Sequence, residues 1–431
     1  MTMRVTSNTI KISNESFKKS FKNTWFPGFS EMKTIVEDYA QMAIRRKDHW
    51  YSFMDLQILI LQAMVKELQT LELLNVKKKT EEDLELVQEY ELITRTTLNA
   101  LIQISNGIAF RFLDYNYSLM SLFQCNKTSV HAILEEGFQS TLELAANLTD
   151  LKGPSSQVLI SDLNTITNIG DIIIKNEDEF EIVEVKKGRG RGARIRRQKE
   201  RMESLTSFIN ESFGTVDNKE VEIVSLPPRK HRLIQLEDCL KESESKGVVE
   251  KKISDFLTIY GIDFEAIKEI DDHKKIEALF KSINNRLNDP EYFSISSIEY
   301  RQLSGNGVPI TVFPIDTKYI VDLLMGSKAY ISVLNFEELE RYIESKGWNA
   351  FNLVKEGVTS DQIEKNFYQI YILFDKENIE KNVSISIDTL TSIMMELMDV
   401  EEYLNSFRIM VAKDSNKNWI PFYEDESGIW R

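Results

Sequence analysis

Residues 170–186 decide the fold of the central region, and they read GDIIIKNEDEFEIVEVK. Two runs of β-branched and other apolar residues flank a polar cluster, which is the pattern of a β-hairpin. If the loop has two or four residues centred on Glu177 and Asp178, Asp171 on the first strand lies opposite Glu184 on the second. A loop of three or five residues would shift the register by one residue and move Asp171 away from Glu184.

Strand alternation adds a lysine to this acidic pair. Residues 180, 182, 184 and 186 share one face of the second strand, so Lys186 lies on the same face as Glu184. Two facing carboxylates repel each other and call for a cation between them, and hard oxygen ligands of this kind suit Mg²⁺ or Mn²⁺. Such a metal polarises a phosphate and activates a bound water, so the residues predict phosphodiester hydrolysis.

The same segment resembles the core of the PD-(D/E)xK, or restriction-endonuclease-like, nuclease superfamily. The resemblance rests on Gly170-Asp171, twelve intervening residues, and then Glu184-Val185-Lys186. It implies that Asp171 and Glu184 bind the metal and that Lys186 assists the attacking water. Gly170 stands where the family usually has proline. The implied activity is metal-dependent cleavage of DNA in preference to RNA, and both endonuclease and exonuclease modes fit these residues.

The helix predicted after the hairpin carries a glutamine on its apolar face. Ile195, Gln198, Met202, Leu205 and Ile209 recur at helical spacing, so Gln198 faces inward and needs a partner. RecB-like members of the superfamily carry a glutamine here in a Q-x-x-x-Y pattern, in which Met202 replaces the tyrosine. A core glutamine bonded to the backbone is the alternative.

A basic segment joins this helix to the hairpin. Residues 186–201 hold nine basic residues and one acid, a charge of +8, and because the whole chain carries −15 the other residues sum to −23. A focused positive patch of this kind, with three glycines, favours sequence-independent contacts to phosphates. The expected contacts are Lys187, Arg189, Arg191, Arg194 and Arg197. A solvated loop and helix face, or a contact for an acidic partner, is the alternative.

Two upstream acids are supporting candidates. The resemblance implies a glutamate on the helix before the sheet, for which we select Glu136. Asp162 ends the strand before the hairpin and could reach the metal, whereas capping a turn is its alternative role.

The whole pattern predicts an α/β and α+β multidomain protein. Residues 1–129 form a mainly helical region, and residues 130–225 form a core with a restriction-endonuclease-like mixed sheet flanked by helices. Residues 226–431 form a mixed α/β region for partner binding or regulation. The core strands are expected in QVLI, TITNI, DIII and FEIVEV, and the C-terminal region has strand-like runs at 310–315 and 329–334 and a helix ending at Gly347.

Composition limits the class of protein. The chain has 431 residues, 42% of them hydrophobic and 28% charged, which excludes disordered and fibrous proteins. Its two cysteines are too few for a disulfide framework. Its most hydrophobic window, residues 53–65, is interrupted by Asp55, Gln57 and Gln62, so we expect a cytoplasmic protein without a membrane span.

Partners are expected beyond the nucleic acid. The chain has no G-x-x-x-x-G-K-[ST] sequence, so a nucleotide-driven activity would need a separate motor subunit. The resemblance suggests an effector of a host-defence or restriction-type system that works with a partner protein. Two other classes stay open, namely a non-catalytic nucleic-acid-binding or assembly module on a nuclease fold, and a scaffold that forms a homo-oligomer through its helical region.

Overall fold

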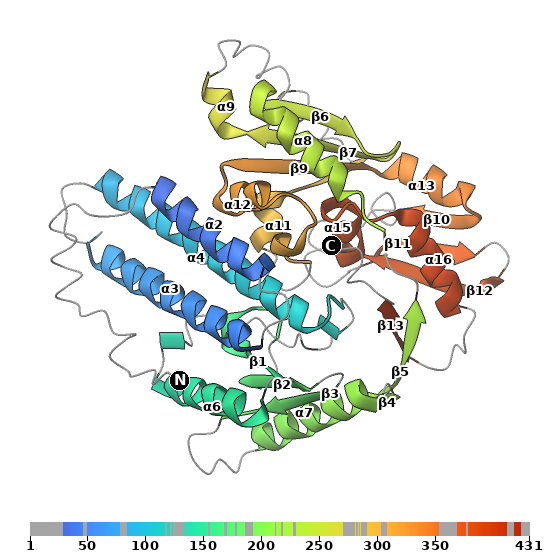
Figure 1. Ribbon diagram of the computed structural model, residues 1–431. Helices are drawn as coiled ribbons and strands as arrows, with labels where there is room; N and C mark the ends of the chain where they lie inside the picture. The colour runs from blue at the N-terminus through green and yellow to red at the C-terminus, as the bar shows by residue number, and fades with distance from the viewer. Residues whose placement is uncertain are drawn as a thin grey trace. The chain divides into compact units, whose positions relative to one another are not determined.

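The computed structural model describes 22 stretches of the chain (Figure 1). They are residues 29–45, 50–77, 84–116, 119–120, 123, 133–134, 136–153, 156–167, 170–176, 179–185, 193–211, 213–216, 219–226, 230–269, 281, 283, 285, 291–302, 308–352, 369–375, 378–411 and 418–423.

The chain divides into two compact units. Unit 1 comprises Met1–Ile223, Pro309–Val312 and Lys417–Phe422, and unit 2 comprises Val224–Val308, Phe313–Asn416 and Tyr423–Arg431. The three regions that the sequence suggests, with boundaries after residues 129 and 225, stay predictions.

Unit 1 begins with helices, as the sequence predicts. They are α2 (Phe29–Arg45), α3 (Trp50–Lys77), α4 (Leu84–Phe112) and α6 (Glu136–Lys152). Apolar residues at helical spacing on α3, including Met54, Leu61, Val65 and Leu68, are buried, which explains why this stretch forms an amphipathic helix. The helical N-terminal region is therefore confirmed for the described residues.

A three-stranded antiparallel sheet follows in the order β1-β2-β3. Its members are β1 (Ser156–Ile160), β2 (Ile172–Asn176) and β3 (Glu179–Val183), and the short 3₁₀ helix η3 (Ser161–Leu163) follows β1 directly. Helices α3 and α6 pack against β1, and α7 (Ala193–Glu211) packs against β3 (Figure 1). The runs QVLI, DIII and FEIVEV thus contribute strands, but the described pairings of this sheet are antiparallel, so a mixed sheet is not found among them.

Unit 1 also contains a second antiparallel sheet, ordered β13-β5-β4. Its strands are β4 (Phe213–Val216), β5 (Lys219–Leu226) and β13 (Asn418–Tyr423), of which the last few residues of β5 and the end of β13 belong to unit 2. A chain segment from near the C-terminus therefore completes a sheet that begins directly after α7.

The strand predicted at 310–315 is wrong, because residues Ile310–Val312 form the 3₁₀ helix η4. Thr311 Oγ1 donates to Gln103 O on α4 at 2.9 Å, and a Cβ at Gly107 would lie 2.2 Å from that hydroxyl oxygen. The absence of a side chain at Gly107 lets η4 approach α4 closely. Pro314 cannot donate to a strand ladder, which also disfavours a strand here.

Unit 2 is built on a four-stranded antiparallel sheet, ordered β6-β7-β9-β8. The strands are β6 (Val248–Lys252), β7 (Leu257–Asp263), β8 (Tyr292–Ser296) and β9 (Lys328–Asn335). The helices around this sheet are α8 (Leu233–Lys246), α9 (Phe264–Glu269), α11 (Ser297–Gln302), α12 (Thr317–Met325) and α15 (Ile387–Met395). The strand predicted at 329–334 is confirmed as part of β9.

A second sheet of unit 2 has the order β10-β11-β12. It consists of β10 (Trp348–Asn352), β11 (Gln369–Asp375) and β12 (Asn378–Ser386), with α13 (Phe336–Ser345) before it and α16 (Val400–Val411) after it. The helix predicted to end at Gly347 is confirmed as α13, and Gly347 has a φ of 90°, as expected after a helix end.

Side chains of β9 satisfy the last carbonyl groups of α15. Tyr330 donates its hydroxyl to Met395 O at 2.8 Å, and Ser332 donates to Met394 O at 2.7 Å. Both residues are fully buried, so each hydroxyl needs such an acceptor. These bonds fix α15 on the sheet of unit 2.

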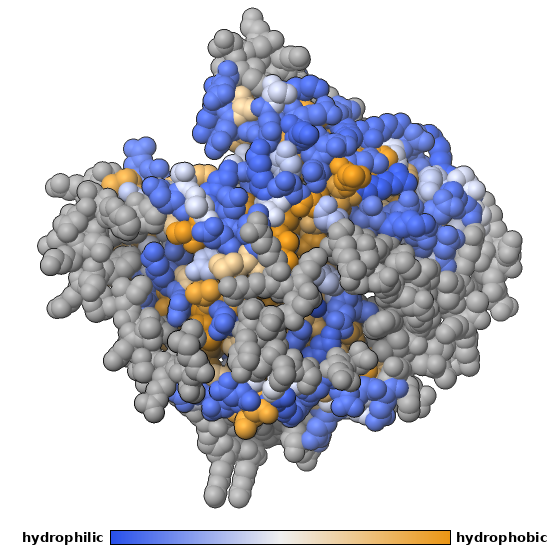
Figure 2. Space-filling model, viewed as in Figure 1, coloured by the Kyte–Doolittle hydropathy of each residue, from blue (hydrophilic) through white to orange (hydrophobic). Residues whose placement is uncertain are grey.

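On the face shown in Figure 2, the surface of α8 and α9 is mainly hydrophilic. Among the helices that the structure describes, none combines the length and the apolar character required to cross a bilayer.

Candidate functional site

The β2–β3 hairpin has the register that the sequence predicts. Its ladder runs from Ile172 opposite Val183 to Asn176 opposite Glu179. The two loop residues, 177 and 178, lie outside the described residues. The predicted strand pairing is confirmed over these five pairs.

Beyond the last pair, Asp171 leaves the regular ladder. Its N–H donates to Val183 O at 2.9 Å, and its Oδ2 accepts the N–H of Val185 at 2.5 Å. The carboxylate of Asp171 is therefore held against the residue that follows Glu184. The two acids meet at one end of the hairpin, but the ladder does not pair them directly as expected, because the Asp171 amide bonds to Val183 instead.

Gly170 makes this arrangement feasible. Its φ is +71°, in the left-handed region, and a Cβ at this position would lie 2.5 Å from Ile182 Cγ2 and 3.0 Å from Val183 O. Proline is restricted to a φ near −65° and cannot adopt this conformation. A glycine, and not a proline, at the residue before Asp171 thus has a conformational reason.

The loop from β1 to β2 is held by two asparagines. Asn164 Oδ1 accepts the N–H groups of Ile166 and Thr167 at 2.9 and 2.8 Å. Asn106 of α4 accepts the N–H of Thr165 at 2.8 Å and donates to its hydroxyl at 2.9 Å. The strand expected in TITNI is therefore wrong for residues 165–167, because side-chain amides take the backbone groups that a strand partner would need.

Asp162 lies in η3, at the same end of the sheet as Asp171. The N–H of its neighbour Ser161 donates to Asp171 O at 3.0 Å, which ties the two segments together. The turn after η3 is capped by Asn164, whose Oδ1 accepts the N–H groups of Ile166 and Thr167. Asp162 is half-buried, and its role toward a metal stays a prediction.

Helix side chains close both edges of the three-stranded sheet. On the β1 edge, Gln57 donates to Val158 O at 2.8 Å and accepts the Ile160 N–H at 2.9 Å. On the β3 edge, Asn210 accepts the Phe180 N–H at 2.9 Å and donates to Phe180 O at 3.2 Å. Each amide supplies the donor and acceptor that a further strand would provide. The two side-chain amides fix the edges of the sheet. They thereby also support the end of the sheet that carries Asp171 and Glu184, here called the acidic end.

The sequence contained a signal for the Gln57 cap that we did not use. Gln57 interrupts the most apolar window of the chain and is only 1% exposed. A buried amide at an apolar helical position requires partners. The argument that places Gln198 on the inward face applies equally to Gln57. For Gln57 it predicts a partner on another element, which the structure identifies as β1.

The described part of the chain covers the predicted basic segment only in part. Four residues lie outside the described residues: Lys186, Lys187, Arg189 and Arg191.

Four other predicted site residues belong to described helices, but their side chains lie outside the description: Glu136 on α6 and Arg194, Arg197 and Gln198 on α7. Met202, Leu205 and Ile209 are buried, so the predicted inward stripe of α7 is confirmed for these three residues.

The acidic end suits a hard divalent cation by donor type. Asp171 and Glu184 supply carboxylate oxygens, and Mg²⁺ typically binds one or two carboxylates, several waters and a substrate phosphate. Within the described residues, no group of three or more His, Cys, Asp or Glu side chains is placed to hold a metal ion. A site with two protein carboxylates falls below that number, so this finding does not bear on it.

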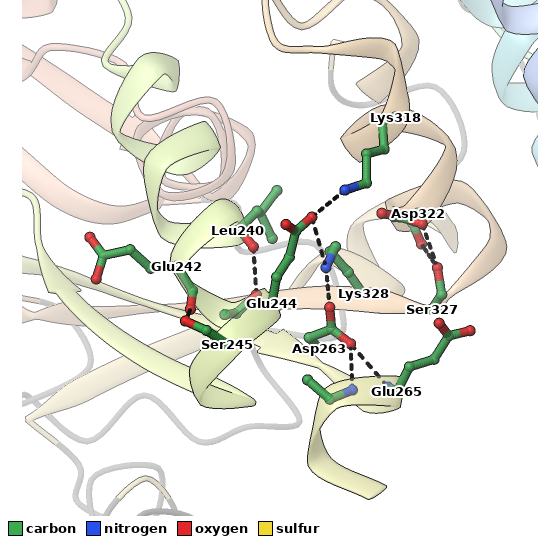
Figure 3. A network of polar contacts seen from close by, with 12 residues as sticks. Leu240, Glu242, Glu244, Ser245, Asp263, Glu265, Lys318, Asp322, Ser327 and Lys328 are labelled. Atoms are coloured by element: carbon green, nitrogen blue, oxygen red, sulfur yellow. Dashed lines mark hydrogen bonds and ion pairs between the residues drawn. The ribbon is translucent and has the colours of Figure 1, made fainter. Parts of the chain in front are cut away.

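Unit 2 contains a separate polar cluster around Lys328 (Figure 3). Lys328 begins β9, is 4% exposed, and pairs directly with Asp263 at the end of β7, where the two side chains form an ion pair. Glu244 on α8 lies 3.7 Å from Lys328 Nζ and 2.5 Å from Lys318 Nζ on α12. Two cations and two carboxylates therefore neutralise one another at the junction of two strands and two helices.

Asp263 also determines where α9 begins. Its Oδ1 accepts the N–H groups of Glu265 and Ala266 at 3.0 and 2.9 Å. Burial raises the pKa of Asp263, but these N–H groups and Lys328 outweigh it and hold the pKa below its ordinary value. The cluster is built for structure, since each carboxylate and each lysine in it already has a partner of opposite charge.

No protein-family model, curated protein or solved structure matches this chain. The site itself therefore carries the functional argument.

Proposed function

We propose that the chain is a metal-dependent nuclease that hydrolyses phosphodiester bonds in DNA, in preference to RNA. The proposal is carried by the carboxylate of Asp171, which accepts the Val185 N–H at the end of the sheet where Glu184 also lies. A carboxylate held in place at one end of a sheet, with a second carboxylate residue beside it, supports the binding of a divalent cation. The resemblance of residues 170–186 to the PD-(D/E)xK core supports the same activity.

Each residue has a distinct part in the proposed reaction. Asp171 and Glu184 would hold Mg²⁺ or Mn²⁺, with the Val185 N–H orienting the Asp171 carboxylate. The metal supplies Lewis-acid activation of the phosphate and of a bound water. Lys186 would position an attacking water and offset developing negative charge, and the basic segment from Lys187 to Arg197 would contact the phosphate backbone.

The finer fold assignment is part of the proposal. Along the chain, one helix precedes the three strands and another follows them, in the order α6, β1, β2, β3 and α7. This order supports a restriction-endonuclease-like core. The resemblance further suggests an effector of a host-defence or restriction-type system, acting with a partner protein or motor subunit.

Two charge-removing variants test the site. Asp171→Asn keeps an oxygen that accepts the Val185 N–H, so it removes the charge and preserves the local bond. Glu184→Gln removes the second charge. The control is Glu181→Gln. Glu181 lies on β3, is 51% exposed and pairs with Lys152 away from the acidic end.

Two measurements are made on the full chain and these variants. Plasmid, linear duplex, single-stranded DNA and RNA are incubated with Mg²⁺, Mn²⁺ or EDTA, and Mn²⁺ binding is measured by calorimetry without nucleic acid. We expect metal-dependent cutting and Mn²⁺ binding in the wild type and in Glu181→Gln. Both should be lost in Asp171→Asn and Glu184→Gln.

The alternative, a nucleic-acid-binding or assembly module without catalysis, predicts a different result. Nucleic acid would bind with a steep salt dependence that is the same in all four proteins, and Mn²⁺ binding would be absent. That outcome would reject the nuclease proposal. Light scattering of the same samples would reveal a homo-oligomeric scaffold.

A further inference from the structure

Unit 2 contains a pocket of about 370 Å³, distant in sequence from the acidic end of the β1-β2-β3 sheet. It lies between the turn that joins β6 to β7, one side of α13 and the start of α16. Its lining includes Arg232, Phe256, Tyr342, Leu397, Met398 and Asp399. The volume is within the range of pockets that take small organic ligands.

Arg232 presents a fixed guanidinium to this pocket. One Nη atom donates to Ile253 O at 3.1 Å, and the other donates to Asp399 Oδ2 at 2.8 Å. An arginine has five N–H donors, so these two bonds hold the planar group and leave donors directed elsewhere. The side chain of Arg232 is 39% exposed, so a ligand can reach it.

The carboxylate of Asp399 is already satisfied. Its Oδ1 accepts the Glu401 N–H at 2.9 Å, and its Oδ2 accepts from Arg232. Burial raises the pKa of Asp399, but Arg232 and the N–H groups at the start of α16 outweigh it and hold the pKa below its ordinary value. Both oxygens of Asp399 thus already accept a hydrogen bond, whereas the guanidinium of Arg232 has N–H donors left for a ligand.

The pocket wall is formed in advance. Leu397 has a φ of 49°, a left-handed conformation that costs a non-glycine residue about 1–2 kcal/mol. Backbone bonds hold it there, since Arg232 N–H donates to Leu397 O at 3.0 Å and Asp399 N–H donates to Lys230 O at 2.8 Å. Strain maintained in this way is typical of ligand-binding positions.

The remaining lining is suited to an apolar or flat group. Phe256 and Tyr342 lie with ring centroids 5.1 Å apart, and Met398 adds a flexible apolar side chain. At the rim, Lys252 and Asp255 form an exposed ion pair, so one cation and one carboxylate lie side by side near the pocket mouth.

We propose that this pocket binds a small organic anion, a carboxylate or phosphate monoester on a flat apolar body. The acid group bonds to Arg232, and the body packs against Phe256 and Tyr342. This site is independent of the proposed nuclease activity, because its residues lie in unit 2 and none belongs to the acidic end of the β1-β2-β3 sheet.

Calorimetric titration of the full chain tests the site with three probes that have both parts: adenosine 5′-monophosphate, phenyl phosphate and benzoate. Two compounds serve as controls: adenosine has the flat body without the acid group, and inorganic phosphate has the anion without the body. We expect at least one of the three probes to bind at a single site more tightly than adenosine or phosphate. Arg232→Gln should weaken this binding by about tenfold or more, because it removes a charged hydrogen bond.

A second pair of variants keeps the test independent of folding, since Arg232→Gln also removes the partner of Asp399. Lys252→Glu reverses an exposed charge at the pocket rim, and Lys246→Glu makes the same change on α8 away from the pocket. We expect about threefold or greater weakening in the first variant only. The proposal is overturned if no probe binds, if adenosine or inorganic phosphate binds as tightly as the tightest of the three probes, or if the two lysine variants bind that probe equally.

Discussion

Replacing Gln57 by leucine would remove the side chain that closes the β1 edge. Two bonds to β1 would be lost, the donation from Gln57 Nε2 to Val158 O at 2.8 Å and the acceptance of the Ile160 N–H at 2.9 Å. Leucine has a similar size, so the change removes polar contacts without leaving a large cavity. The Ile160 N–H and the Val158 carbonyl would then lack a partner in a buried environment.

The size of the effect follows from these two groups. An unsatisfied buried backbone group costs about 1–3 kcal/mol, so two cost about 2–6 kcal/mol. Gln57 is 1% exposed, which leaves no room for water to replace it. Burying leucine in place of glutamine returns about 1–2 kcal/mol of apolar transfer free energy. We expect Gln57→Leu to lower the free energy of unfolding by about 2.5 kcal/mol, the middle of the range of about 0–5 kcal/mol that these terms give.

Urea unfolding and amide hydrogen exchange check this expectation. Gln62→Leu is the control, because Gln62 is half-buried on the same helix, and it should change stability by no more than about 0.5 kcal/mol. The Ile160 amide should exchange faster in Gln57→Leu than in the control. Equal stability of the two variants, together with unchanged exchange at Ile160, would refute the edge-closing role.

Three further predictions concern backbone strain and charge. Gly170→Ala should lower the unfolding temperature, because the φ of +71° costs alanine about 1–2 kcal/mol and its Cβ would clash; an unchanged temperature in a thermal melt would contradict this. Lys328→Met should destabilise by about 3–5 kcal/mol in urea, since it leaves the Asp263 carboxylate buried without its cation, and adding Asp263→Asn should restore part of the loss. The pKa values of Asp263 and Asp399 are lower in the folded protein than in the unfolded chain, so their stabilisation is present above their ordinary pKa and is lost as the pH falls through the folded values. Urea midpoints should therefore fall between about pH 5 and pH 2, and Asp399→Asn should flatten this dependence; an identical slope would argue against it.

Local patterns in the sequence were sufficient for several elements. The hairpin followed from a short polar loop between two β-branched runs, and the side-chain period of a strand limited its register to two alternatives, between which the structure decided. The helix α13 followed from apolar residues at helical spacing and the glycine after its end. Both depend on interactions within about ten residues of chain, which a sequence displays directly.

Where contacts came from distant parts of the chain, local patterns misled. Residues 310–315 have the composition of a strand, but Thr311 bonds to Gln103 on α4, more than two hundred residues earlier. Residues 165–167 have the same composition, but Asn106 on α4 takes the backbone N–H of Thr165. In both cases a helix side chain or backbone group replaced the strand partner that the pattern implied.

The candidate site divides in the same way. Its acids and their meeting at one end of the hairpin were readable from residues 170–186, because strand pairing brings residues at matched distances from a loop together. The departure of Asp171 from the ladder was not readable, since it depends on the left-handed Gly170 and on the Val185 N–H.

The sequence by itself determined the helical N-terminal region, the hairpin and the two acids near its end, because each depends on periodicity and on turn chemistry over short distances. Only the tertiary structure decided how the sheet ends at its edges, where Gln57 and Asn210 replace missing strands, and how the pocket around Arg232 forms. The physical reason is that a buried polar group must find a partner, and that partner can lie anywhere along the folded chain.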